Sequence, residues 1–197
     1  MEIAEVATKG KWTASIVGIV LGIGLLVLAA AMLRRDPVRE LANQLNEGNA
    51  RQRYKAAKKL EELGPNGSDA VTALAQAISD DDPQVRYRSA KALSKMGELA
   101  EAAVPSLIEG LQDQDREIRY YCAKSLYKVG KAAAPARDTI LAILNDSDDE
   151  TQVYLVKTLG DIGEEHKPSI DAVKKLCKST DEKLRAAAQE ALEDILD

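Results

Sequence analysis

The residues that could perform acid, base or nucleophilic chemistry are few and widely spaced in this 197-residue chain. His166 is the single histidine, and it follows Glu164 and Glu165 in a short polar segment. Nucleophilic and general acid–base catalysis need a base paired with a second reactive side chain, and His166 provides no such pair. The sequence therefore predicts a solvated loop histidine, with no catalytic residue, metal site or cofactor.

The two cysteines, Cys122 and Cys177, stand far apart and form no CxxC pair. Each occupies a position that small or apolar residues hold elsewhere in an internal repeat, so both are expected to be core thiols on different helices. Unpaired thiols favour a reducing compartment. The glycines are isolated and form no phosphate-cradling loop.

A repeat of 33 residues organises most of the chain. Glycines recur at Gly64, Gly97, Gly130 and Gly163, each preceded by a leucine four residues earlier. A strict period of this length is typical of a solenoid of stacked units. The composition agrees, because Ala, Leu, Ile and Val dominate the apolar residues and Phe is absent.

Each unit is predicted to contain two helices. In the unit that starts near Pro83, Val85, Leu93 and Met96 recur at helical spacing, Gly97 ends the first helix, and Pro105 opens the second. The expected domain covers 36–197, with a half unit at 38–46, four full units at 49–180 and a capping helix at 182–196. The predicted helix pairs are 50–63 with 68–79, 83–96 with 102–112, 116–129 with 134–145, and 149–162 with 167–178.

An uncharged segment at 14–33 follows a short polar N-terminus at 1–13. Twenty residues at about 1.5 Å per residue span the hydrocarbon layer of a bilayer, so a single transmembrane helix is expected. A cleaved signal is the alternative, because lysines precede the run and 29–31 is an alanine triplet that suits cleavage. Arginines after the segment place the large domain in the cytoplasm by the positive-inside rule.

Small residues in this segment recur at every fourth position, at Ala14, Gly18 and Gly22. They would lie on one face of the helix, where a second membrane helix could approach closely. The expected localisation is a cell or thylakoid-type membrane.

Tyrosine and lysine recur with the 33-residue period and are predicted to point away from the core. These side chains either fill the outer surface and pack between units, or they bind a partner protein, for which tyrosine is well suited. The candidate partner-binding residues on the first helices of the units are Tyr54, Tyr87, Tyr120, Tyr127, Lys58, Lys91 and Lys124.

The second helices of the units should form the inner surface, which solenoids commonly use for binding. Its outward positions are polar and mixed in charge. The candidate contacts here are Gln76, Glu109, Asp138 and Asp171.

The segment from Asp80 to Gly97 has the pattern Asp-x-Asp-Pro-x-Val-Arg, followed by Ala, Ala-Leu and Met-Gly at helical spacing. It resembles a HEAT repeat, and more narrowly the short repeats of phycobilisome lyases and bacterial scaffold proteins. The resemblance covers about 38–197 and implies an all-α, right-handed α-solenoid after the membrane helix. It implies no activity, because the family includes scaffolds, adaptors and some enzymes. The His-Glu pairs of the HEAT-like di-iron hydroxylase are missing.

The resemblance also implies a structural ladder, in which the acid ending one second helix pairs with the arginine that begins the next unit. The corresponding residues are Asp80, Asp113, Asp146, Arg86, Arg119 and Arg185. The fourth unit departs from the pattern, with Gln152 at the arginine position.

The charge balance argues against nucleic acid as the partner. Outside residues 1–35 the chain has 23 basic and 30 acidic residues. An excess of seven negative charges repels a phosphate backbone.

The sequence therefore favours a non-catalytic, membrane-anchored scaffold that recruits a partner protein, with the bilayer contacted through 14–33. One alternative is a lyase or lyase subunit that attaches a tetrapyrrole to a client protein. Another is a periplasmic or secreted scaffold, if the apolar segment is cleaved.

Overall fold

The computed structural model describes residues 36–163 and 166–196. Within them, no helix is both long and apolar enough to cross a bilayer. The expected transmembrane helix at 14–33, with its contact residues Ala14, Gly18 and Gly22, lies outside the described residues.

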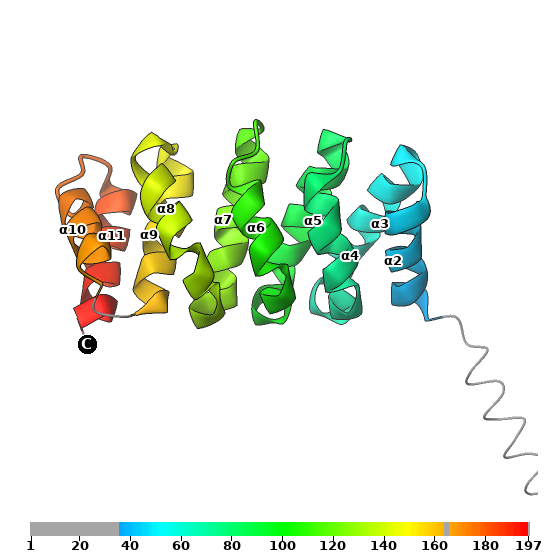
Figure 1. Cartoon of the computed structure of the whole chain (residues 1–197), viewed down its shortest axis with the longest axis horizontal. Coiled ribbons are helices and arrows are strands. Elements are labelled where there is room, and N and C mark those ends of the chain that lie inside the picture. The colour runs from blue at the N-terminus through cyan, green and yellow to red at the C-terminus, as the bar shows by residue number, and fades with distance from the viewer. Residues whose placement is uncertain (1–35, 164–165, 197) are drawn as a thin grey trace, which may run out of the picture. The chain divides into compact units, whose positions relative to one another are not determined.

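The described chain is helical, and its helices alternate between two layers. One layer contains α3 (Ala50–Leu63), α5 (Pro83–Met96), α7 (Arg116–Val129), α9 (Asp149–Ile162) and α11 (Glu182–Leu196), and each of these helices packs on the next. The other layer contains α4 (Val71–Gln76), α6 (Val104–Gly110), α8 (Arg137–Ile143) and α10 (Lys167–Leu176). The short helix α2 (Pro37–Glu47) precedes them all. The result is an α-solenoid whose units follow one another along the long axis (Figure 1).

The first helices of the units coincide with the ranges expected from the sequence, because their ends are encoded locally. Asp82 and Asp115 accept hydrogen bonds from the backbone two residues on, which caps α5 and α7. Gly97 and Gly130 follow these helices with φ of 62° and 71°. Side chains other than glycine rarely adopt this conformation, so the helices end there.

The connections between the helices of a unit differ from the expected ones. In the first three full units they are seven-residue 3₁₀ helices: η1 (Gly64–Ala70), η3 (Gly97–Ala103) and η4 (Gly130–Ala136). The following α-helices are consequently shorter than predicted, and α4 and α8 end in the 3₁₀ turns η2 (Ala77–Ser79) and η5 (Leu144–Asp146). Small residues such as Ala100, Ala103, Ala133 and Ala136 are buried in these connections, where the layers approach closely.

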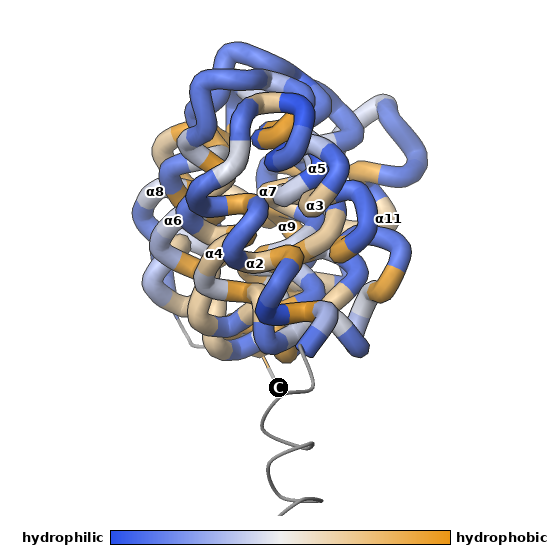
Figure 2. The backbone as a smooth tube through the Cα atoms, turned by 90° about the vertical axis from the view of Figure 1, so that its right-hand side faces the viewer, coloured by the Kyte–Doolittle hydropathy of each residue, from blue (hydrophilic) through white to orange (hydrophobic). Residues whose placement is uncertain are grey.

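A continuous core lies between the two layers. Leu60, Leu93 and Leu126, one per unit at the same repeat position, have no exposed surface. In the view along the stack, apolar residues gather inside while polar residues cover the outside, with α4, α6 and α8 on one side and α5 and α11 on the other (Figure 2). Each unit therefore buries its apolar side against its neighbours, as a solenoid requires.

The cysteines differ in their environments. Cys122 in α7 is completely buried, and burial raises the pKa of its thiol above the ordinary value. Cys177, which immediately follows α10, is half-buried and packs against the core, so it is less buried than the predicted core thiol. The equivalent Ile78, Leu111 and Leu144 are buried. The helix before Cys177, α10, is the last helix of the second layer in the described chain. No further helix of that layer therefore covers Cys177.

Candidate interaction surface

The outward sides of α3, α5 and α7 form one surface, which we call the basic tyrosine face. It is defined by Tyr54, Tyr87, Tyr120, Lys58, Lys91 and Lys124, which occupy two equivalent positions in three successive units, and by Lys128, about one turn after Lys124 in α7. The tyrosines are half-buried, Lys58 is exposed, and Lys91 and Lys124 are half-buried.

The tyrosines of this face pack across the boundaries between units. Tyr87 in α5 meets Tyr121 in α7 edge-to-face, with ring centroids 5.4 Å apart. Tyr120 lies edge-to-face with Tyr121 at 5.0 Å and with Tyr154 of α9 at 5.4 Å. Tyr127 lies tilted against Tyr154 at 5.8 Å. Five rings thus connect three helices, and edge-to-face pairs of this kind add to the stability of the stack.

Cations lie over the rings. The Lys124 ammonium is 5.5 Å from the ring centroids of Tyr120 and Tyr154, and 6.0 Å from that of Tyr121. Lys91 lies 5.3 Å from the ring of Tyr87 and also donates a 3.2 Å hydrogen bond to its hydroxyl. Distances within about 6 Å are in the range of cation–π attraction. The aromatic array is therefore interleaved with positive charge.

A buried carboxylate anchors the N-terminal end of this face. Glu61 in α3 is 6% exposed and accepts hydrogen bonds from Arg88 at 2.8 Å and Lys95 at 3.1 Å. Lys91 adds a third cation at 3.7 Å. Burial alone would raise the pKa of Glu61, but the Arg88 and Lys95 hydrogen bonds and the charge of Lys91 outweigh it and lower the pKa. Glu61 therefore stays charged and binds α3 to α5.

This cluster was not found from the sequence. The equivalents of Glu61 in later units are Ser94, Tyr127 and Gly160, so the acid does not recur with the repeat. The signal that could have identified it is that a single acid stands at a position facing the next unit. Arg88 was missed for a similar reason, because its equivalents Tyr121 and Tyr154 belong to the aromatic array.

Several lysines of the face retain an uncompensated charge. Among residues 36–163 and 166–196, no ion pair involves Lys58, Lys124 or Lys128. Lys58 and Lys128 are exposed. These ammonium groups are available to an acidic ligand.

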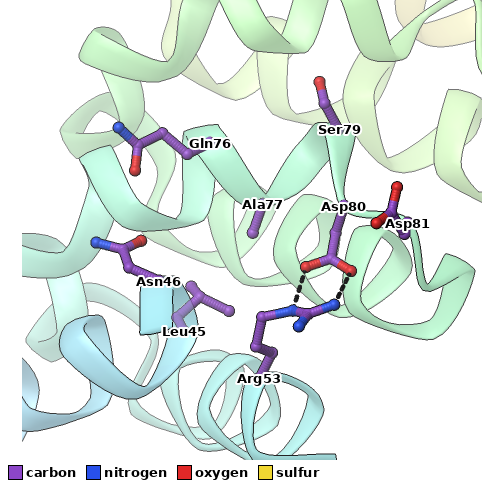
Figure 3. A pocket seen from close by; sticks show the side chains of 8 residues that line it. All are labelled: Leu45, Asn46, Arg53, Gln76, Ala77, Ser79, Asp80 and Asp81. Atoms are coloured by element: carbon purple, nitrogen blue, oxygen red, sulfur yellow. Dashed lines mark hydrogen bonds and ion pairs between the residues drawn. The ribbon is translucent and has the colours of Figure 1, made fainter. Parts of the chain in front are cut away.

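A different edge of the solenoid contains the turns between units, and the ladder charges meet there. The Arg53 guanidinium donates to both carboxylate oxygens of Asp80, at 2.6 and 2.8 Å, as Figure 3 shows. One unit on, Arg86 donates to Asp113 at 2.7 and 3.4 Å. Bidentate pairs are among the stronger polar interactions. Burial would raise the pKa of Asp80, but the Arg53 hydrogen bonds and the Asp82 backbone N–H outweigh it and lower the pKa.

The pairing differs from the expected ladder. Each carboxylate pairs with the arginine that begins its own unit, 27 residues earlier, and not with the arginine of the next unit. The next arginine instead donates to a backbone carbonyl: Arg86 to Asp80 at 2.9 Å and Arg119 to Asp113 at 2.9 Å. The two helices of a unit run antiparallel, so the start of the first and the end of the second lie at the same edge.

The ladder is incomplete toward the C-terminus. Asp146 is exposed, and no ion pair of the described chain involves it. Arg185 donates to the carbonyl of Ser179 at 3.0 Å. Gln152 takes the arginine position of the fourth unit and donates to the Leu144 carbonyl at 2.7 Å. Ser179 stands 27 residues after it, where the other units have an acid. Both partners of a charged pair are thus replaced by neutral groups in the same unit.

Two equivalent grooves lie beside the Arg–Asp pairs. The first, of about 320 Å³, is lined by Gln76, Asp80 and Asp81 among others (Figure 3). The second, of about 490 Å³, is lined by the equivalent Glu109, Asp113 and Gln114. Gln76 and Glu109 were predicted as contacts, and both are exposed.

The remaining predicted contacts lie elsewhere. Asp138 in α8 and Asp171 in α10 are exposed in the layer of second helices, and Tyr127 belongs to the aromatic array. His166 precedes α10 and shares a 2.9 Å hydrogen bond between its Nδ1 and the Ser169 hydroxyl. In the described ranges, no group of three or more His, Cys, Asp and Glu is arranged to hold a metal ion.

The model of HEAT repeats matches the chain over residues 38–126 and 104–193. The chain belongs to the HEAT-repeat family. No curated protein matches it.

Solved structures resemble this HEAT chain in fold. An engineered protein is 23% identical over 81% of this chain and 79% of its own, with a TM-score of 0.70. A designed armadillo repeat protein in complex with the peptide (KR)4 is 15% identical over 79% and 80%, with a TM-score of 0.68. The complex of CpcE and CpcF of phycocyanin lyase from Nostoc sp. is 24% identical over 82% of this chain and 65% of that chain, with a TM-score of 0.65.

Proposed function

We propose that this protein is a non-catalytic, membrane-anchored adaptor whose HEAT solenoid binds a partner protein. The observation that carries the proposal is the basic tyrosine face, where half-buried rings lie beside Lys91 and Lys124, and where Lys124 and the exposed Lys58 form no ion pair with the described residues. Tyrosine and basic side chains suit a protein contact, because the ring is buried while the polar tip bonds the partner.

The stack supports this role by holding the face rigid. Glu61 ties α3 to α5, and the ring pairs tie α5 to α7 and α7 to α9. A partner that binds a preorganised surface loses less conformational entropy on binding.

The membrane part of the proposal is supported by the uncharged run at 14–33 and the arginines after it. Anchoring would raise the effective concentration of the solenoid near a membrane-associated partner. The full chain should remain with membranes during alkaline carbonate extraction, whereas a chain of residues 36–197 should be extracted. Release of the full chain, or a mature N-terminus after residue 31, would contradict the anchor.

Site-specific photo-crosslinking tests the adaptor function. A benzophenone amino acid at Lys58 or Lys128 samples the basic tyrosine face, and at Gln76 or Glu109 it samples the grooves. Asn66 and Glu98, exposed residues of the connections η1 and η3, provide the control positions. We expect one discrete protein to be captured from the face and not from the control positions. Equal capture from all positions would contradict a defined binding surface.

A lyase or lyase subunit is the second candidate, favoured by the structural likeness to the phycocyanin lyase complex. If it is correct, co-expression with tetrapyrrole synthesis and a phycobiliprotein should give a client whose absorbance shows attached pigment. Unchanged absorbance would exclude it.

A further inference from the structure

We infer that the partner segment bound by the basic tyrosine face is an acidic, extended peptide. This inference rests on the proposed adaptor function and adds the chemistry of the partner. It comes from how charge is distributed among the helices of a chain whose net charge is −5.

Positive charge is concentrated on three adjacent helices. α3, α5 and α7 contain five, four and four Lys and Arg residues, against two, zero and one Asp and Glu. One of these acids, Glu61, is buried and already held by three cations. Six of these 13 cations are paired with carboxylates, namely Arg53, Arg86, Arg88, Lys91, Lys95 and Arg116. Lys58, Lys124 and Lys128 form no ion pair with the described residues, so the outward surface of these helices is basic although the molecule is acidic. The net-charge argument against anionic partners does not hold for this face.

The charge reverses on the C-terminal side. α9 has one basic and three acidic residues, and α11 has two basic and four acidic ones. Asp161 of α9 lies near Asp194 and Glu190 of α11, and burial together with the charge of Asp194 raises its pKa. The turns between units add further carboxylates at another edge. The basic region is thus confined to three units and bordered by negative charge.

This confinement limits the size of the ligand. Packed helices lie about 8–10 Å apart, so the axes of α3 and α7 are separated by about 20 Å. An extended chain covers that distance with about six residues. A short acidic segment fits within the basic region, whereas a long phosphate backbone or a flat anionic membrane would also meet the acidic border.

The tyrosines also favour a peptide over a nucleic acid. Base stacking requires open ring faces. Here the rings of Tyr87, Tyr120, Tyr121 and Tyr154 meet one another edge-to-face, and lysines lie over them. The Tyr54 and Tyr87 hydroxyls already accept hydrogen bonds from Arg88 and Lys91. The ammonium groups of Lys58, Lys124 and Lys128, which form no ion pair with the described residues, are therefore the groups of this surface that can bind carboxylates.

The test measures binding of a fluorescent peptide of about eight residues that alternates Glu and Gly to the full chain in neutral detergent, by fluorescence anisotropy. The Lys–Gly counterpart is the probe of opposite charge. We expect the acidic peptide to bind at low salt and to weaken as salt rises. We expect the Lys–Gly peptide not to bind.

Two matched variants locate the binding. The first replaces Lys58, Lys124 and Lys128 by Gln; the second makes the same change at Lys167, Lys174 and Lys178, three exposed lysines of or near α10. We expect the first to weaken acidic-peptide binding by about tenfold and the second to leave it unchanged. Circular dichroism checks that both variants retain their helix content.

Three results would overturn the inference: no binding of the acidic peptide at low salt, equal weakening by both variants, or tighter binding of single-stranded DNA or phosphatidylserine vesicles at the same lysines. If crosslinking captures a partner at the face and the acidic peptide does not bind, the adaptor function stands and the acidic partner falls. If no partner is captured but the acidic peptide binds at these lysines, the preference for an acidic ligand is supported and the adaptor function is not.

Discussion

At the scale of single residues, the charged side chains that stabilise the fold are those held against a defined partner, such as Arg86. Arg86 joins two units, because its guanidinium donates to the Asp113 carboxylate and to the carbonyls of Asp80 and Asp81. It is partly shielded from water, with 20% of its side chain exposed. Loss of this group removes the Arg86 donor from both carbonyls and leaves the Asp113 carboxylate with the backbone N–H of Asp115.

Replacing Arg86 by Ala should lower the free energy of unfolding by about 1–3 kcal/mol, since hydrogen bonds to charged groups are worth that much when broken. Chemical denaturation followed by circular dichroism measures the change. Arg51→Ala is the control, because Arg51 is exposed at the start of the same kind of helix, and surface changes usually stay within about 0.5 kcal/mol. Equal losses in both variants would show that the Arg86 contacts add nothing.

Glu61 gives a pH-dependent contribution of predictable sign. Its folded-state pKa is lowered from 4.5, so its stabilising effect is complete above the unfolded-state value and is lost as the pH falls through the folded one. Stability measured from neutral pH down to acid pH should therefore fall more steeply for the wild type than for Glu61→Gln. Parallel curves would mean that Glu61 and its three cations do not stabilise the folded state.

At the scale of elements, the glycine after each first helix decides where the helix ends. Gly130 has φ of 71° and ψ of −137°, a conformation that only glycine adopts readily. No atom lies within 4 Å of a Cβ built there. A side chain at position 130 would therefore strain the backbone without a steric clash.

Gly130→Ala should cost about 1–3 kcal/mol from backbone strain alone, and urea denaturation measures it. Gly110→Ala is the steric comparison, because its Cβ would lie 2.5 Å from the Cys122 sulfur. A second substitution, Cys122→Ala, should recover part of the loss for Gly110→Ala and none for Gly130→Ala. Rescue of both would contradict a backbone origin at Gly130.

At the scale of the whole molecule, stability depends on contacts between neighbouring units. In the described chain, α5, α7 and α9 each pack on the first helix before and the one after, whereas the end helices α3 and α11 have a neighbour of their layer on one side only. In such a linear array, damage in the middle affects both directions and damage at the end affects one.

Leu126→Ala removes a fully buried side chain of α7 and should cost about 2–5 kcal/mol. Hydrogen exchange should then be faster in α5 and α9 as well as in α7. Leu184→Ala in α11 should speed exchange in α9 to α11 and leave α3 and α5 protected. If both variants speed exchange uniformly, the solenoid unfolds as a single cooperative unit.

The sequence by itself determined the architecture and the positions of the first helices. Asp82, Asp115, Gly97 and Gly130 recur at a fixed interval, and each acts on the backbone within a few residues. Local signals of this kind can be recognised in the sequence without knowledge of the contacts that each helix makes with other units. The 3₁₀ connections were missed, because burial of small residues between two layers selects them.

The tertiary structure alone decided which charges are neutralised. From sequence position, either Arg53 or Arg86 could form an ion pair with Asp80. The antiparallel arrangement of the two helices brings Arg53 to Asp80, and the pair forms there. Glu61 pairs with cations of the next unit, while Lys124 lies over aromatic rings and forms no ion pair with residues 36–163 and 166–196. These outcomes depend on distances of a few ångströms between different units, because an ion pair forms only where side chains meet. Composition and repeat period do not contain that information.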